Sequence, residues 1–127
     1  MEAGQHPAGY TGPHEERFKD GTLSCTGAFA EGRKTGEWVY FLKDGKLKAR
    51  GQWQDGVMEG AWVWYRANGQ KLQEGSFATG KQVGLWRRWH DNGQLLDEGE
   101  FRDGKKAGSW RAWNASGALV SEKRHKS

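Results

Sequence analysis

A chain of 127 residues has room for one domain of ordinary size, and its 20 Lys and Arg against 16 Asp and Glu give a formal charge of +4. A content of 35% hydrophobic residues excludes a thick hydrophobic core. No apolar stretch approaches the ~18 residues of a transmembrane helix. The one cysteine, Cys25, excludes an internal disulfide framework or a cysteine-based metal site. Disordered chains do not use 20 Gly and 8 Trp in this way, so we expect a thin structure in which a few large apolar side chains recur.

The first segment, residues 1–17, contains both prolines and none of the repeated columns that follow. We expect it to be a flexible N-terminal segment. Its start lacks the basic and apolar regions of a signal peptide. Together with the unpaired cysteine, this predicts a cytoplasmic protein.

From residue 18 to residue 120 the sequence repeats with a period of 24 residues. The clearest column consists of Trp38, Trp62, Trp86 and Trp110. A glycine column precedes it by two residues, and two more aromatic columns are Phe29, Trp53, Phe77 and Phe101, and Phe41, Tyr65, Trp89 and Trp113. Such a period indicates a repeat architecture, in which each unit buries its apolar face against its neighbours.

Each unit reads as two strands joined by a turn. The first strand carries Gly-x-Trp-x-x-aromatic, as in residues 84–89, and the second strand follows, as in residues 94–101. Asp-Gly or Asn-Gly between them, as at Asp44-Gly45, predicts a type I′ turn with positive φ at both central residues. Frequent glycine opposes helix. The fold class is therefore all-β: an elongated single-layer antiparallel meander of 24-residue β-hairpin repeats, with about nine strands.

A further glycine column stands inside the strands, at Gly27, Gly51, Gly75 and Gly99. Glycine weakens a strand, so we expect each one to leave room for an aromatic ring from the neighbouring strand to lie flat on the backbone. Trp38 and Phe41 have opposite parity, which leaves two alternatives. Either a bulge intervenes, or aromatic side chains lie on both faces of the sheet.

The last residues, 121–127, lose the glycine and aromatic columns and are rich in Lys, Arg and His. They are expected to form a basic C-terminal tail. Such a tail contacts an acidic partner or discourages edge-to-edge pairing by its charge.

The unit G-x-W-x-x-(F/Y/W)-x-x-(D/N)-G-x-L, followed by G-x-(F/W)-x-D-G, resembles the MORN repeat, in the variant found in the bacterial YwqK-like antitoxin proteins. The resemblance covers residues 18–120. It implies β-hairpin repeats and, through the family name, the binding of a toxin. MORN-type repeats also serve as scaffolds and as binders of membranes or phosphoinositides. The resemblance brings no catalytic motif.

Columns that change between units are free to carry function. The pair after each column Trp reads Val-Tyr, Val-Trp, Arg-Arg and Arg-Ala, so it changes from apolar to basic along the chain. Tyr and Trp beside Arg are typical of protein interfaces. The candidate protein-binding residues are Tyr40, Trp64, Arg87, Arg88 and Arg111. The alternative is that Tyr40 and Trp64 only extend the core and that the arginines are only solvated.

The remaining polar residues form no catalytic or metal-binding constellation. The four histidines are far apart, no glycine-rich loop precedes a helix, and no serine has the context of a nucleophile elbow. We therefore predict a non-catalytic protein-binding module without cofactor, metal or small-molecule substrate, whose partner is a toxin in the family that it resembles. Two alternatives stay open, a scaffold module and a binder of nucleic acid or an acidic lipid surface. The chain is expected to be a monomer or an end-to-end oligomer.

Overall fold

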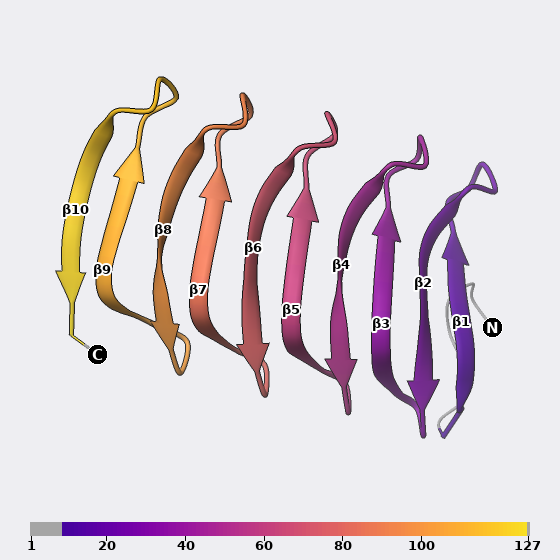
Figure 1. The fold of residues 1–127 in the computed structure, drawn as a ribbon. Helices are drawn as coiled ribbons and strands as arrows, with labels where there is room; N and C mark the ends of the chain where they lie inside the picture. The colour runs from indigo at the N-terminus through magenta and orange to yellow at the C-terminus, as the bar shows by residue number, and fades with distance from the viewer. Residues whose placement is uncertain (1–8, 127) are drawn as a thin grey trace.

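The computed structural model describes residues 9–126, which form one ten-stranded antiparallel sheet (Figure 1). Strand order equals chain order, so the sheet is an open meander, as the sequence predicts, with ten strands where about nine were expected. The described residues include no helix that could span a membrane. The strands are β1 Gly12–Arg17, β2 Leu23–Ala30, β3 Arg33–Phe41, β4 Leu47–Gln54, β5 Val57–Tyr65, β6 Lys71–Ala78, β7 Lys81–Trp89, β8 Leu95–Arg102, β9 Lys105–Trp113 and β10 Leu119–His125.

The two ends of the strands carry different turns. Where β4 turns into β5, Asp55 and Gly56 have φ values of 50° and 80°, so this two-residue connection has the positive φ at both positions that a type I′ turn requires. At the opposite end Gly45 alone has positive φ, its N–H donates to the Leu42 carbonyl, and the Asp44 carboxylate accepts from the Lys46 N–H. The type I′ prediction at Asp44-Gly45 is therefore wrong. The connection is longer, and a type I turn followed by a left-handed glycine closes it.

The glycines inside the strands are seats for tryptophan rings, as predicted. A Cβ atom on Gly75 would lie 2.0 Å from Cδ2 of Trp86, which is closer than the Cβ of a real side chain approaches another atom. The same ring donates its Nε1–H to the Ser76 carbonyl at 3.1 Å. The other three pairs of this kind are Gly27 with Trp38, Gly51 with Trp62, and Gly99 with Trp110. All four tryptophans are buried although the sheet has a single layer.

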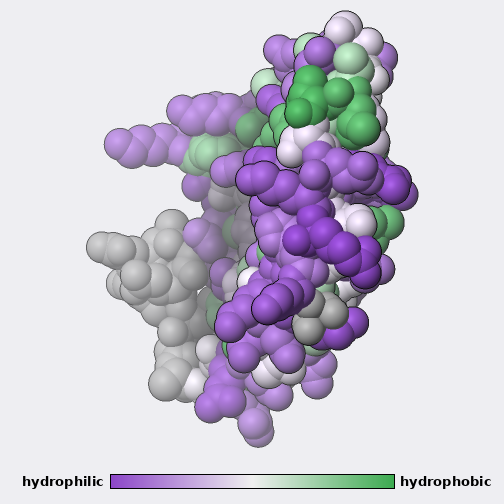
Figure 2. Space-filling model, turned by 90° about the vertical axis from the view of Figure 1, so that its left-hand side faces the viewer, coloured by the Kyte–Doolittle hydropathy of each residue, from purple (hydrophilic) through white to green (hydrophobic). Residues whose placement is uncertain are grey.

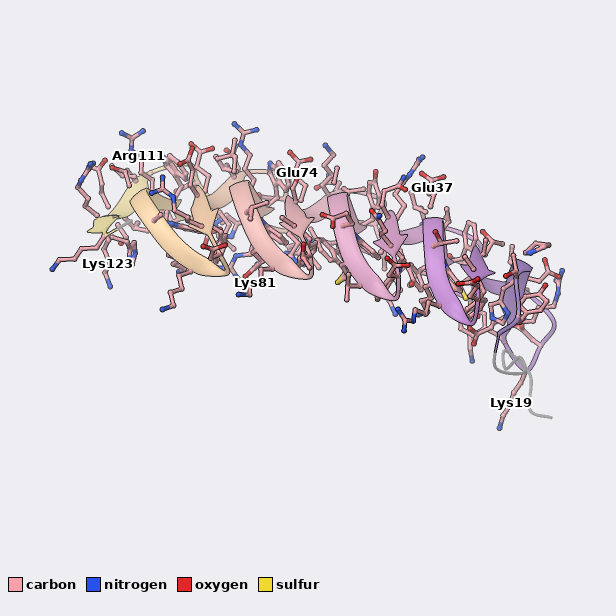
Figure 3. The ribbon with its side chains drawn as sticks, turned by 90° about the horizontal axis from the view of Figure 1, so that it is seen from below. Lys19, Glu37, Glu74, Lys81, Arg111 and Lys123 are labelled. Atoms are coloured by element: carbon pink, nitrogen blue, oxygen red, sulfur yellow. The ribbon has the colours of Figure 1, made fainter. Side chains whose placement is uncertain are left out.

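The sheet has two chemically different faces. The aromatic face carries the Trp column, against which Phe77 and Phe101 set their ring edges. The charged face carries rows of ionic side chains. Figure 3 shows Glu37, Glu74 and Arg111 on this face and Lys123 on the other side of the ribbon.

Of the two alternatives left open for the third aromatic column, the second is realised, aromatic side chains on both faces, and the extra residue at the register shift, Leu96, belongs to β8. The register shifts between Arg88 and Trp89. The Lys71 ammonium lies 5.6 Å from the Trp89 ring and 2.8 Å from the carboxylate of Glu74, which belongs to the charged face. Trp89 therefore lies on the face opposite to Trp86.

Both predicted end segments take part in the sheet. Residues 12–17 form β1, so the predicted boundary of a flexible segment at residue 17 is wrong for them, whereas residues 1–8 lie outside the described residues. His14 stands 24 residues before Trp38, pairs with Gly27, and is buried against the Trp38 ring at 5.6 Å. This packing holds β1 in the sheet.

The predicted basic tail is likewise a strand as far as His125, and residue 127 lies outside the described part. β1 and β10 are the two edges of the sheet. Figure 2 looks onto the β10 edge, which is mostly hydrophilic with an apolar patch near its top. Leu119 and Val120, at the start of β10, are exposed.

Candidate binding surface

Three of the five predicted residues lie in one row of the aromatic face. The cross-strand register joins Tyr40 to Ala49, Ala49 to Trp64, Trp64 to Gln73, Gln73 to Arg88, and Arg88 to Asp97. Residues paired in this way share a face. Tyr40, Trp64 and Arg88 are therefore brought together, separated along the row by the side chains of the intervening strands.

Arg87 and Arg111 lie on the opposite face. They belong to a cross-strand ladder of alternating charge, formed in order by Glu74, Arg87, Glu98, Arg111 and Glu122. Arg87 pairs with Glu98 at 2.9 Å and Arg111 with Glu122 at 2.8 Å. The five predicted residues thus do not form one surface, because neighbouring residues of a strand point to opposite faces.

Tyr40 and Trp64 extend the core and also line a hollow. Both rings stack on Trp62, with centroids 6.3 Å and 5.7 Å away. The Tyr40 hydroxyl accepts a hydrogen bond from Trp53 Nε1 at 3.2 Å, and burial raises the pKa of Tyr40. With Met58, the rings line a mainly apolar hollow of about 230 Å³, which we call the apolar notch. These rings therefore extend the core and also line the apolar notch, where they remain partly exposed.

Arg88 lies in a second hollow with different chemistry. Its guanidinium holds the buried carboxylate of Asp97 through two nitrogens, the shorter contact being 2.6 Å, and this hydrogen bond raises the pKa of Arg88. Lys106 places its ammonium 4.6 Å from the centre of the Trp110 ring. Together with Gln73 and Gln82 these groups line a hollow of about 290 Å³, which we call the polar notch.

The two notches share their frame. Residues of the apolar notch recur in the polar notch 48 residues later, two repeats on. The equivalent pairs are Tyr40 and Arg88, Ala49 and Asp97, Trp53 and Phe101, Met58 and Lys106, and Trp62 and Trp110. The repeat thus builds the same kind of hollow at these two places, and only the side chains make it apolar at one and charged at the other.

Sequence reasoning missed several lining residues, namely Trp53, Met58, Gln82, Asp97 and Lys106. The column that reads Met58, Gln82 and Lys106 changes chemistry from unit to unit as strongly as the pair after the Trp does. That variation was available as a signal. What the sequence did not show was that this column faces Tyr40, Trp64 and Arg88 across the notches.

The one cysteine sits in an unreactive setting. Cys25 is buried, and its thiol donates to the Glu16 carboxylate at 3.5 Å, which also lies 3.1 Å from His14 Nε2. Burial, reinforced by the charge of Glu16, raises the pKa of Cys25 to about 11. A thiol that stays protonated at neutral pH is a poor nucleophile. In the described part of the chain, no group of three or more His, Cys, Asp and Glu could hold a metal ion.

Comparison with known proteins agrees with this geometry. The MORN repeat variant matches residues 34–55, 58–78 and 82–103, which together make up half of the chain and follow the 24-residue period. No curated protein matches the sequence. The chain belongs to the MORN repeat variant family, whose repeats indicate a module that binds protein or lipid.

Proposed function

We propose that the protein is a non-catalytic protein-binding module whose partner lies on the aromatic face. The observation that carries this proposal is the pair of equivalent notches, each of which is lined by aromatic rings and by a lysine that has no carboxylate partner in the described part of the chain. Lys48 lines the apolar notch and Lys106 the polar notch, and neither forms an ion pair with another described residue. Aromatic residues, Met and Arg, which also line the two notches, are enriched where proteins bind one another.

The charged face offers a partner fewer charged groups that are free to form new interactions. Several of its carboxylates and cations already form ion pairs, as in Arg50 with Glu37 at 2.9 Å and Arg87 with Glu98 at 2.9 Å. A partner that bound there would have to displace these pairs or leave them as they are. The aromatic face instead exposes ring edges and ammonium groups that gain from burial and neutralisation.

The narrower proposal is that the partner is a protein toxin, which the module occludes in the cytoplasm. The resemblance of the repeat to the YwqK-like antitoxin proteins supports it. A sheet whose rings are locked onto backbone glycines also loses little conformational entropy when it binds, which favours a tight complex.

Co-purification with the product of a neighbouring gene tests the proposal. We expect a stable complex with the full-length protein, weakened by Trp64→Ala and by Lys106→Glu, two substitutions on the aromatic face. Arg111→Gln, on the charged face, serves as the matched control and should leave the complex intact. Circular dichroism shows whether each variant is folded. A complex insensitive to both aromatic-face substitutions in folded protein would contradict the proposed surface.

An anionic lipid surface is the second candidate. The unpaired lysines of the aromatic face favour it, because cationic side chains near aromatic rings suit a membrane interface. Co-sedimentation with vesicles containing phosphatidylserine distinguishes the two. Lipid binding that disappears between low and moderate salt, with no protein complex, would replace the first proposal.

A further inference from the structure

We infer that the aromatic face binds an extended peptide segment of its partner along the long axis of the sheet, with an apolar side chain in the apolar notch and an acidic side chain in the polar notch. The inference rests on the proposed function and names the chemistry of the partner. It depends on how the two notches are lined, on their charge, and on the distance between them.

The apolar notch has the lining for a hydrophobic side chain. Trp53, Met58 and Trp64 are among the residues that line it, and its volume is about 230 Å³. The one hydroxyl at its wall, on Tyr40, is already engaged with the Trp53 indole. Apart from Lys48, a polar side chain placed here would find few partners, whereas an aliphatic or aromatic one removes apolar area from water.

The polar notch has a net positive charge. Arg88 and Asp97 neutralise each other at 2.6 Å, so their pair adds no net charge. Lys106 remains, held against Trp110 with no described carboxylate as partner. The side-chain amides of Gln73 and Gln82 add hydrogen-bond donors. A carboxylate is the group that satisfies a lysine and amide donors together.

The spacing between the notches limits the bound segment. The apolar notch is centred on β4 and the polar notch on β7 and β8, which puts them three to four strands apart. Strands lie about 4.8 Å apart, so the notches are separated by roughly 17 Å. An extended chain advances about 3.3 Å per residue, so roughly five residues span this distance. The segment crosses the strands and is recognised through its side chains.

Selection from a phage-displayed library of random dodecapeptides on the immobilised full-length protein tests the inference. We expect the enriched peptides to carry an apolar residue followed or preceded, about five positions away, by Asp or Glu. Lys106→Glu should lower the affinity of such a peptide roughly tenfold and, in a new selection, replace the acidic residue by Lys or Arg. Arg111→Gln, on the opposite face, should leave the selected pattern unchanged.

Two results would overturn the inference. One is an absence of paired apolar and acidic residues at this spacing, and the other is an acidic preference that survives Lys106→Glu in folded protein. If the complex with the neighbouring gene product still forms and still depends on Trp64, the proposed function stands and only the extended acidic segment is wrong. If neither peptides nor a protein partner bind, both proposals fail.

Discussion

At the residue scale, the decisive contact is that between a glycine and the ring that covers it. Trp86 is buried in a single layer because its ring lies where a Cβ on Gly75 would be. The glycine thus replaces the second layer that most sheets need in order to bury an aromatic side chain. This contact recurs at four points along the sheet and explains how a chain with 35% hydrophobic residues folds.

We expect Gly75→Ala to destabilise the protein by about 3 kcal/mol or more, because the added methyl group would overlap the Trp86 ring. The ring cannot move away without losing the hydrogen bond from its Nε1–H to the Ser76 carbonyl. Urea denaturation measures the change in the free energy of unfolding. Ser76→Ala, one residue away, is the control and should change it by less than about 0.5 kcal/mol. Equal effects of the two substitutions would contradict the role of Gly75.

Cys25 should be unreactive in the native protein. With a pKa of about 11 against 9.0 for a free thiol, it carries roughly a hundredfold less thiolate at pH 8. Iodoacetamide should therefore alkylate it far more slowly than it alkylates glutathione, and unfolding in urea should remove the difference. The sign for stability follows: the unfolded chain releases this proton first, so the contribution of Cys25 is present below pH 9 and is lost as the pH rises towards 11. Rapid native alkylation at pH 8 would contradict the buried setting.

At the element scale, strand pairing is reinforced on the charged face by the ion ladder that runs from β6 to β10. Each charge faces an opposite charge on the next strand, and such pairs contribute a few tenths to about 1 kcal/mol each. The ladder also fixes the register, because a slip of one residue would move every ladder residue to the aromatic face. Arg87 and Arg111 therefore have a structural role.

Glu98→Lys places a cation between Arg87 and Arg111. We expect it to lower the free energy of unfolding by about 1–2 kcal/mol at low salt, since it replaces two attractive cross-strand pairs by repulsive ones. The loss should shrink in 1 M NaCl, where exposed charges are screened. Glu122→Lys, with one arginine neighbour in the ladder, should cost less. A salt-independent loss would point to packing as the cause.

At the scale of the whole molecule, the edge strand β10 lacks the glycine that the equivalent strands β2, β4, β6 and β8 carry. Lys123 occupies the position that is glycine in the preceding units and pairs with Trp110 in register. At the equivalent Gly99, a Cβ would lie 2.2 Å from the ring supplied by the next strand. A further tryptophan-bearing strand therefore cannot add to β10 as it does elsewhere, which disfavours a scaffold that grows by continuing the repeat.

We expect the unmodified protein to be a monomer in size-exclusion chromatography with light scattering. The Lys123→Gly variant should associate at concentrations at which the unmodified protein is still monomeric. The substitution removes the side chain that blocks a ring and leaves β10 open to a strand of a second copy. Lys126→Gly, beyond the end of β10, is the matched control and should stay monomeric. End-to-end oligomers of the unmodified protein would show that Lys123 does not close this edge.

The sequence by itself determined the repeating unit, the meander and the seating of rings on glycines. These features depend on local periodicity, which the sequence shows directly. The 24-residue columns place each tryptophan opposite a glycine on the neighbouring strand. The first strand escaped prediction because His14 replaces the column Trp, and the turn type at Asp44-Gly45 was misjudged because the same dipeptide serves both two-residue and longer connections.

Only the tertiary structure decided which side chains share a surface. Alternation places neighbours such as Arg87 and Arg88 on opposite faces, but which residues of different strands stand opposite one another depends on the register and its shifts. The structure thereby separated Arg87 and Arg111 from Tyr40, Trp64 and Arg88, and it joined Met58 and Lys106 to the notches. Each notch is assembled from neighbouring strands, so its lining depends on pairing between residues distant in the chain.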